Sequence, residues 1–296
     1  MIETDFLRAL AAVAGEVNGA LGRLLPEVAG PENRVIQAMR YAVLDGGKRL
    51  RAFLVVAGGD MLAIPRPQSM RVAAAIEMVH GYSLVHDDLP AMDDDDTRRG
   101  RPTVHRRFDE ATAILAGDAL LTTAFEVLAA PETHPDGAVR ASLVAALAKA
   151  AGAAGMVGGQ MIDLSAPNLN LDIAGLEQLQ ALKTGALIAF AASVGALLAQ
   201  DEDARRDLQA YGEALGLAFQ VTDDILDVEG SAAEVGKATG KDAAAGKATF
   251  VSRLGLEGAR NHARSLCGRC LASLDRFGAR AKLLRQATEF VVNRRS

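Results

Sequence analysis

The chain contains no tryptophan, and aromatic residues make up only 4% of its 296 positions. Aromatic side chains favour strands, whereas alanine and leucine, which dominate this sequence, favour helix. No alternation of apolar and polar residues persists between turn signals, as a half-buried strand would require. The composition therefore predicts helices throughout and excludes a β-rich fold.

Cysteine is nearly absent as well, since the chain has only Cys267 and Cys270, within the stretch CGRC. A single pair cannot complete a tetrahedral zinc site, and no alternation of strands and helices surrounds it to indicate a redox motif. We expect both cysteines to be small core residues of a helix, in a protein of the reducing cytoplasm.

Long apolar runs and a strong excess of charge are also missing. The first segment, MIETDFLRALAAVAGEV, has neither the basic start nor the continuous apolar run of a signal peptide. The longest apolar stretches, such as TGALIAFAASVGALLAQ, are shorter than the roughly 20 residues that cross a bilayer. A net charge of −5 argues against a general basic face for nucleic acid. We expect a cytoplasmic protein without stable membrane insertion and without a nucleic-acid partner.

Helical periodicity covers almost the whole chain, with breaks at stretches such as IPRPQ and SAPNLNLD. Hydrophobic residues make up 50% of the sequence, enough for a large core, and no repeat or linker divides it. We therefore predict an all-α fold of roughly ten or more helices in a single domain, residues 1–296. The expected helices span roughly 3–25, 32–45, 48–63, 68–90, 109–130, 137–157, 174–199, 203–228, 256–275 and 279–293.

Two acidic clusters depart from the amphipathic pattern. In the second, DDILD, Asp223 and Asp227 are one helical turn apart on the same face, and Asp224 lies about 100° round the axis. Like charges at this spacing destabilise a helix by roughly a few tenths of a kcal/mol, and the helix dipole disfavours anions near a C-terminus. A divalent cation such as Mg²⁺, which takes hard oxygen ligands, would reverse this unfavourable electrostatics.

The first cluster, HDDLPAMDDDD (residues 86–96), begins where the preceding helix is expected to end. On an unbroken helix Asp93 would point about 120° away from Asp87. Pro90 disrupts the helix between them, and that break can bring Asp93 back towards Asp87. Asp94 to Asp96 have a weaker claim to a metal and can be solvated.

Groups of lysine and arginine accompany the acids. Magnesium held by acid clusters commonly serves a phosphate, which arginine grips with a bidentate fork and lysine with a point charge. The stretch GKATGKDAAAGKATF is not a P-loop, because alanine follows each Gly-Lys where the loop needs serine or threonine for magnesium. Together, the acids and bases predict a diphosphate site. The basic groups are GGKRLR (46–51), Arg98, Arg99, Lys183, Lys237, Lys241 and Lys247.

Several motifs then follow one another in register: GGKRLR (46–51), EMVHGYSLVHDDLPAMDDDDTRRGRPT (77–103), GDALLTTAF (117–125), GGQMIDL (158–164), KTGAL (183–187), FQVTDDILD (219–227) and GKATGKDAAAGKATF (236–250). On these residues the chain resembles the trans-isoprenyl diphosphate synthases, or polyprenyl synthetases, over essentially its whole length. It is most similar to the short-chain bacterial members that make farnesyl diphosphate.

The resemblance implies an isoprenoid synthase fold, all-α, whose helices surround a deep central cavity, usually as a homodimer. It also implies that the acid clusters face each other across the cavity mouth and share three magnesium ions. The implied principal ligands are Asp87, Asp93 and Asp223, supported directly or through water by Asp88, Asp224 and Asp227.

The resemblance further implies two diphosphate sites for a condensation of isopentenyl diphosphate with an allylic diphosphate. The implied allylic contacts are Arg98, Lys183, Thr184, Gln220 and Lys237, with Lys247 nearby. The implied isopentenyl contacts are Lys48, Arg51, His80 and Arg99, with Arg294 and Arg295 as candidates to close over them. The dipoles of Thr184 and Gln220 would stabilise a carbocation without reacting with it, so that these two residues and Lys183 form the catalytic set.

Product length depends on what limits the growing tail. Tyr82 lies five residues before Asp87, about 7–8 Å along the helix axis, and its ring would form a cavity floor. In the family, an aromatic residue here, with the two extra residues Pro90 and Ala91 in the first cluster, is typical of the bacterial farnesyl enzymes. A twenty-carbon product remains the alternative. A terpene cyclase and a non-catalytic synthase subunit are more distant alternatives.

Overall fold

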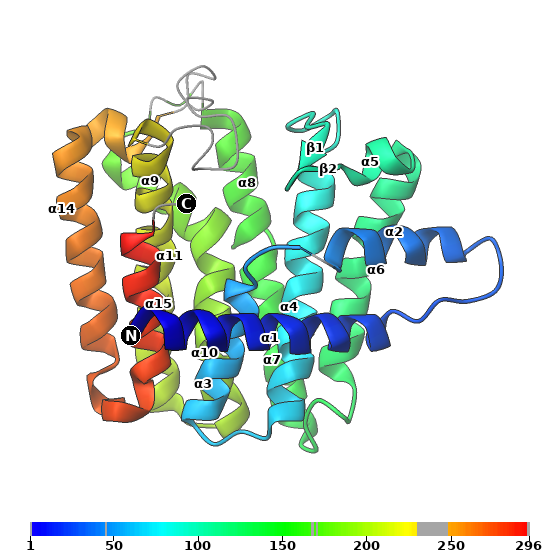
Figure 1. Cartoon of the computed structure of the whole chain (residues 1–296), viewed down its shortest axis with the longest axis horizontal. Helices are drawn as coiled ribbons and strands as arrows, with labels where there is room; N and C mark the ends of the chain where they lie inside the picture. Colours follow the sequence, from blue (N-terminus) through cyan, green and yellow to red (C-terminus); the bar gives the residue numbers. More distant parts are fainter. Residues whose placement is uncertain (1, 45, 167–168, 170, 230–247, 295–296) are drawn as a thin grey trace. The chain divides into compact units, whose positions relative to one another are not determined.

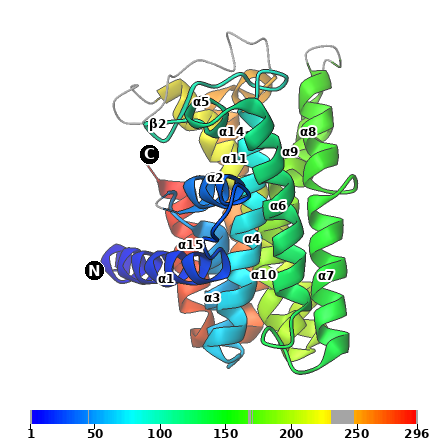
Figure 2. The same cartoon turned by 90° about the vertical axis from the view of Figure 1, so that its right-hand side faces the viewer.

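Two long helices form the centres of two compact groups of helices. A computed structural model describes residues 2–44, 46–166, 169, 171–229 and 248–294. Helix α4 (Arg66–Asp87) is the centre of the N-terminal unit, Leu7–Val144, and α11 (Glu202–Glu229) is the centre of the C-terminal unit, Met1–Phe6 with Ala145–Ser296. Figures 1 and 2 label the helices of both units.

In the N-terminal unit, α4 packs against α3 and α6, and α2 packs against both α4 and α6 (Figure 2). Helix α4 is central because apolar side chains surround it, among which Val72, Ile76 and Val79 are fully buried. The other elements of this unit are α1 (Ile2–Leu24), α2 (Asn33–Val43), α3 (Leu50–Met61), β1 (Thr97–Arg98), β2 (Arg101–Pro102), α5 (Val104–Arg107), α6 (Glu110–Ala129) and the first part of α7 (Gly137–Ala151).

In the C-terminal unit, α11 packs against α10 and α14, and it also contacts α15. Its apolar residues Leu217, Val221 and Ile225 share a buried cluster with Phe250 and Leu266 of α14. The other elements are α8 (Met156–Ser165), α9 (Ile173–Gln180), the π-helix η2 (Ala181–Gly185), α10 (Ala186–Ala199), α14 (Phe250–Ser273), the 3₁₀-helix η3 (Asp275–Ala281) and α15 (Lys282–Asn293).

Two glycines one turn apart let α11 approach its neighbours closely. A Cβ atom at Gly212 would lie 2.4 Å from Cα of Ala189, and one at Gly216 would lie 2.6 Å from Cα of Gly185. The next residue on the same face of α11 is Gln220, so the backbone contact at Gly216 sets how near Gln220 comes to the π-helix.

The prediction of an all-α fold with ten or more helices is confirmed among the described residues. The prediction of a single helix over 137–157 is wrong, because α7 ends at Ala151 and α8 begins at Met156. Gly155 makes the break, since a Cβ atom there would lie 2.1 Å from the Ala150 carbonyl oxygen.

Other boundaries also differ from the prediction. The expected helix 256–275 follows a kink at Gly255, whose φ angle is 69°. A short helical stretch precedes the kink and begins at Phe250, where the side chains of Thr249 and Ser252 form a capping box. The expected helix 174–199 is α9 and α10 joined by the π-helix. The sequence pattern showed no strand, yet β1 and β2 pair in a two-residue ladder closed by Arg99 and Gly100, whose φ angles are 54° and 73°.

Within the described residues, three helical stretches are long and apolar enough to cross a membrane by length and composition alone, namely Glu110–Ala129, Gly137–Ser165 and Ile173–Ala199. The second and third are each made of successive helices with a turn or a π-helix between them. In the third, 72% of the most apolar window is buried inside the protein, as expected of a core helix.

The close approach of α11 predicts the effect of one added methyl group. In Gly216→Ala the Cβ atom would meet the Gly185 backbone, so the helices must separate and the free energy of unfolding should fall by about 1–3 kcal/mol. Urea unfolding followed by circular dichroism measures the change.

Gly268→Ala is the matched control. Gly268 is an exposed glycine within α14, and a Cβ atom there would meet nothing within 4 Å. Because alanine favours helix, this variant should gain up to about 1 kcal/mol. Equal stabilities for the two variants would contradict the close packing of α11.

Candidate active site

The first acid cluster sits on a turn at the C-terminal end of α4. Asp87 is the last residue of the helix and Asp88 is its C-cap. Beyond Pro90 the chain folds back, so that the Asp93 N–H donates to the Asp87 carbonyl oxygen at 2.8 Å. The structure thus brings Asp93 back to Asp87, as the proline predicted.

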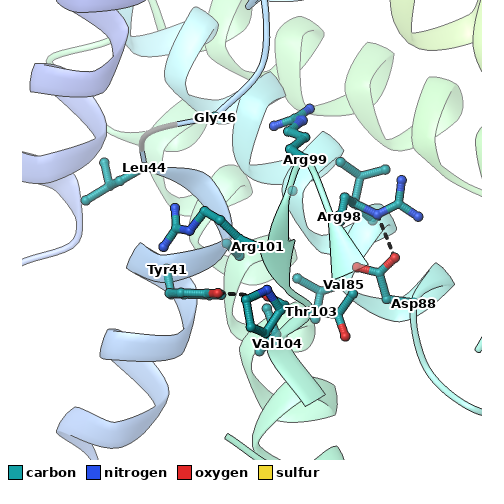
Figure 3. A pocket seen from close by; sticks show the side chains of 14 residues that line it. Tyr41, Leu44, Gly46, Val85, Asp88, Arg98, Arg99, Arg101, Thr103 and Val104 are labelled. Carbon is teal, nitrogen blue, oxygen red and sulfur yellow. Dashed lines mark hydrogen bonds and ion pairs between the residues drawn. The ribbon is translucent and has the colours of Figure 1, made fainter. Parts of the chain in front are cut away.

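The remaining acids of this cluster meet arginines. Asp88 is 3% exposed and accepts a hydrogen bond from Nε of Arg98 at 2.6 Å (Figure 3). Burial raises the pKa of Asp88, and Arg98 opposes that rise. Asp95 also contacts Arg98, at 3.4 Å, and Asp96 pairs with Arg106. Asp95 and Asp96 are therefore paired acids, which the sequence pattern did not reveal.

A recess of about 530 Å³, including its open mouth, lies between the β-hairpin and the end of α2. Figure 3 shows the side chains that line it. The Tyr41 hydroxyl donates to the Pro102 carbonyl oxygen at 2.8 Å, and the Arg101 guanidinium lies over the Tyr41 ring at 4.2 Å. Arg98 and Arg99 line the same recess. The hairpin therefore presents three arginines beside the first acid cluster.

The loop before α3 is shaped by Arg99. A Cβ atom at Gly46 or Gly47 would lie 2.8 or 2.7 Å from a guanidinium nitrogen of Arg99, and φ of Gly47 is 79°. The left-handed backbone of Gly47 favours glycine, and both glycines leave room for the Arg99 guanidinium beside this loop, which continues into Lys48 and Arg51.

His80 of α4 belongs to this basic group. Burial, and then the charges of Arg51, Arg99, Arg49 and Arg98, hold the pKa of His80 well below its ordinary value of 6.5. Its ring is therefore neutral at neutral pH. Of the isopentenyl contacts expected from sequence, Arg51 and Arg99 thus lie near His80 in the N-terminal unit, as cations beside one uncharged imidazole.

Two residues away, Tyr82 is 6% exposed, and its ring lies edge-on to His86 with the ring centroids 5.8 Å apart. Burial raises the pKa of the Tyr82 hydroxyl, and the charge of Asp87 adds to the rise. The ring is thus a well-packed group one helical turn or more below the acid cluster.

The second acid cluster occupies the last turns of α11, and Asp223 and Asp224 have different surroundings there. Nη2 of Arg294 donates to Oδ1 of Asp223 at 2.6 Å and to the Phe219 carbonyl oxygen at 2.9 Å, and its guanidinium lies 3.8 Å from the Phe219 ring centroid. Asp224 turns away and accepts the Phe250 N–H at 2.7 Å, at the start of α14. Arg294 therefore reaches the second acid cluster, and Asp224 also anchors a helix.

The predicted catalytic residues meet where α8, the π-helix and α11 come together. Nζ of Lys183 donates to Oδ2 of Asp163 at 2.7 Å, and Oγ1 of Thr184 donates to Oε1 of Gln220 at 3.2 Å. Lys183, Gln220 and Asp163 line a recess of about 570 Å³ that also contains Asp224.

The residues predicted for these sites and the residues found there are not all the same. Lys237 and Lys247, predicted to contact the allylic diphosphate, and Arg295 lie outside the described residues. Asp163 was missed as the partner of Lys183, although the GGQMIDL motif contains it. An isolated acid in an amphipathic helix carries no sequence signal of its partner.

The carboxylates of the two acid clusters are the ligands available to magnesium. Within the described ranges, no group of three or more His, Cys, Asp or Glu side chains is gathered closely enough to hold a metal ion by itself. Magnesium usually keeps several waters and takes only one or two carboxylates plus substrate phosphates. The carboxylate pairs Asp87–Asp93 and Asp223–Asp227 supply that kind of ligand, so the chemistry of the residues fits the ion.

Comparison with known proteins agrees with this chemistry. A sequence profile described as polyprenyl synthetase matches residues 32–288. The farnesyl diphosphate synthase of Escherichia coli K12 is 45% identical over 296 residues, covering 98% of this chain and 99% of the relative. Geranylgeranyl pyrophosphate synthase 9 of Arabidopsis thaliana is 43% identical over 269 residues, 88% of this chain and 74% of the relative.

A solved structure shares the fold. The crystal structure of an FPP/GFPP synthase from Zymomonas mobilis superposes with a TM-score of 0.89 at 43% identity, covering 98% of this chain and 99% of that one. With the profile match over most of the sequence and relatives of this identity over nearly its full length, the chain belongs to the polyprenyl synthetase family.

Proposed function

We propose that the protein is a farnesyl diphosphate synthase, a prenyltransferase that condenses isopentenyl diphosphate with dimethylallyl and then geranyl diphosphate. The observation that carries this assignment is the similarity to farnesyl diphosphate synthases along almost the entire chain. Geranylgeranyl diphosphate synthesis is the second candidate, since a synthase of that kind is only slightly less similar. Relatives from bacteria also fit a cytoplasmic protein.

Members of this family generally depend on Mg²⁺, and we assign three ions to the active site. Asp87, Asp93 and Asp223 would be the principal ligands, supported by Asp88 and Asp227. Bound there, magnesium supplies positive charge that stabilises the charge developing on the leaving diphosphate. Arg294 and Arg98 already balance Asp223 and Asp88, so each carboxylate would share its charge between an arginine and the ion.

The side chains of the protein would perform the remaining steps. Lys183, Arg98 and Lys237 hold the allylic diphosphate, with Lys247 nearby, while its C–O bond ionises to a carbocation. The Thr184–Gln220 pair offers oxygen dipoles that stabilise the cation and are too weak as nucleophiles to capture it. The isopentenyl double bond attacks the cation, and the proton then lost passes to the released diphosphate.

The N-terminal unit would hold isopentenyl diphosphate. Lys48, Arg51 and Arg99 supply charge, and neutral His80 supplies a hydrogen-bonding group that does not add to their mutual repulsion. The lysine and arginines keep the site positively charged, so that it attracts an anion. Because the ring is uncharged, it adds no further repulsion that would destabilise the fold.

We further propose that the whole chain acts as one synthase domain around a central cavity, and that two copies form a homodimer. Ile114 and Leu115 of α6 are 45% and 56% exposed, which suits burial against a second copy. In the cavity, the Tyr82 ring would limit the growing tail to fifteen carbons.

Product analysis tests the function. With labelled isopentenyl diphosphate, Mg²⁺ and either dimethylallyl or geranyl diphosphate, we expect a dominant fifteen-carbon diphosphate by chromatography. A dominant twenty-carbon product would assign the second candidate function instead, and no prenyl product from either primer would refute both. Asp87→Ala is the inactive control, in which turnover should fall by about 10²-fold or more because a charge-stabilising ligand is lost.

Replacing Tyr82 tests the cavity floor. In Tyr82→Ala the product should lengthen to twenty carbons or more, because the ring that blocks the tail is removed. Tyr82→Phe keeps the ring and should still give fifteen carbons. An active Tyr82→Ala enzyme with an unchanged product would place the floor elsewhere.

The neutral state of His80 predicts a pH dependence of stability. Below about pH 6.5 the unfolded chain takes up a proton at His80 that the folded protein does not, so stability falls as the pH drops. In His80→Gln this fall should be smaller, as measured by urea unfolding at pH values from about 8 to about 5. His134→Gln, in the same unit, is the control, and a His80→Gln profile identical to that of the unmodified protein would contradict a lowered pKa.

A further inference from the structure

A buried ion pair in the N-terminal unit has no role in the reaction described so far. Nη1 of Arg49 donates to Oε2 of Glu77 at 2.9 Å, and the two side chains are 5% and 3% exposed. Two charges so deeply buried carry a desolvation penalty that a simple structural contact does not require. Both residues lie inside motifs that flank predicted substrate contacts, GGKRLR and EMVHGY.

Arg49, at the N-cap of α3, connects that helix with three others, α1, α2 and α4. Besides Glu77, its Nη2 donates to Oδ1 of Asn18 in α1 at 2.7 Å and to the carbonyl oxygen of Val43, the last residue of α2. Its own backbone is left-handed, with φ of 53°, at the N-cap of α3. A residue other than glycine rarely adopts that region, so the surrounding contacts must hold it there.

Glu77 makes a second connection with its other oxygen. Oε1 accepts the N–H of Ala52, in the first turn of α3 and next to Arg51, at 3.2 Å. On α4, Glu77 precedes His80 by three residues and lies on the same face. One carboxyl group therefore joins α4, the helix that carries His80, to the segment that contains Lys48 and Arg51.

The charge of Glu77 acts on the same cations. Burial lowers the pKa of Arg51 and of Arg99, and Glu77 opposes that shift in both. Arg49 and Arg98 add positive charge around Arg99. Glu77 thus offsets part of the repulsion among arginines that come from three separate segments.

We propose that Glu77 is a positioning residue for isopentenyl diphosphate, acting through Arg49 and the Ala52 amide to hold Lys48 and Arg51 in register with His80. This inference rests on the proposed function, because it assigns those three residues to the isopentenyl site. Glu77 does not contact the substrate. It fixes the spacing of the groups that do, and a displacement of about 1 Å in such groups can cost about 10²-fold in rate.

The test uses the full-length enzyme and the double variant Arg49→Met/Glu77→Leu. Apolar replacement of both partners of a buried pair commonly keeps a protein folded, whereas loss of one partner leaves an uncompensated charge. We expect the KM for isopentenyl diphosphate to rise at least about tenfold and the KM for geranyl diphosphate to change by less than about threefold. Urea unfolding reports stability separately.

Glu77→Asp provides a second measurement that does not depend on the folding of the double variant. It keeps the charge and shortens the reach by one methylene group, so the KM for isopentenyl diphosphate should rise selectively, but less than in the double variant. The control is Arg66→Met/Glu16→Leu, which removes an exposed Arg–Glu pair between α4 and α1 in the same unit and should leave both KM values unchanged.

The outcomes separate this inference from the proposed function. A folded double variant, or Glu77→Asp, with an unchanged KM for isopentenyl diphosphate would overturn the role of Glu77 while the unmodified enzyme still makes prenyl product. Parallel rises in both KM values would also overturn it, because a general loss of structure affects both substrates. If the unmodified enzyme makes no prenyl product, the proposed function itself fails.

Discussion

Each cluster of like charges must be offset by groups of opposite charge or by a neutral group, and the rest of this structure depends on that constraint. The chain concentrates carboxylates at the ends of α4 and α11, and arginines on the hairpin and before α3. Each concentration would be unfavourable alone. Arginines pair with the acids, as in Asp88–Arg98 and Asp223–Arg294. Glu77 pairs with Arg49, and His80, which is neutral, adds no charge to the arginines around it. The resulting balance fits the magnesium and diphosphate sites proposed for both clusters.

That balance requires a rigid framework, which the helix packing supplies. In the C-terminal unit the Gly216–Gly185 backbone contact brings α11 against the π-helix, and this contact allows Thr184 to reach Gln220. In the N-terminal unit Gly46 and Gly47 let a loop pass beside Arg99. The glycines thus determine how closely these segments approach one another, and the polar and charged residues near them determine which groups the site offers.

Much of the fold and part of the site could be predicted from sequence. Apolar periodicity predicted α4 and α11 closely, because each buries a long run of side chains and periodicity reports burial directly. The return of Asp93 to Asp87 followed from Pro90, a local effect. Helix α8 and the β-hairpin were missed, since glycine-rich turns and a two-residue ladder depend on backbone conformations that periodicity does not record. The pairing of Lys183 with Asp163 could not be predicted, because the two residues are twenty positions apart and either could have faced water.

The sequence by itself determined the fold class, the family and the kinds of group available to the site, because residue type and local spacing carry that information. It placed two sets of acids at helix ends and bases near them, which already indicated a metal and a diphosphate. Only the tertiary structure decided which charged groups pair with one another. Arg294 binds Asp223, and Asp224 accepts an N–H at the start of α14. Glu77 joins two segments through Arg49 and the Ala52 amide. Partners in space are chosen by the packing of whole helices, and the free energy of each pairing depends on burial that no single segment specifies.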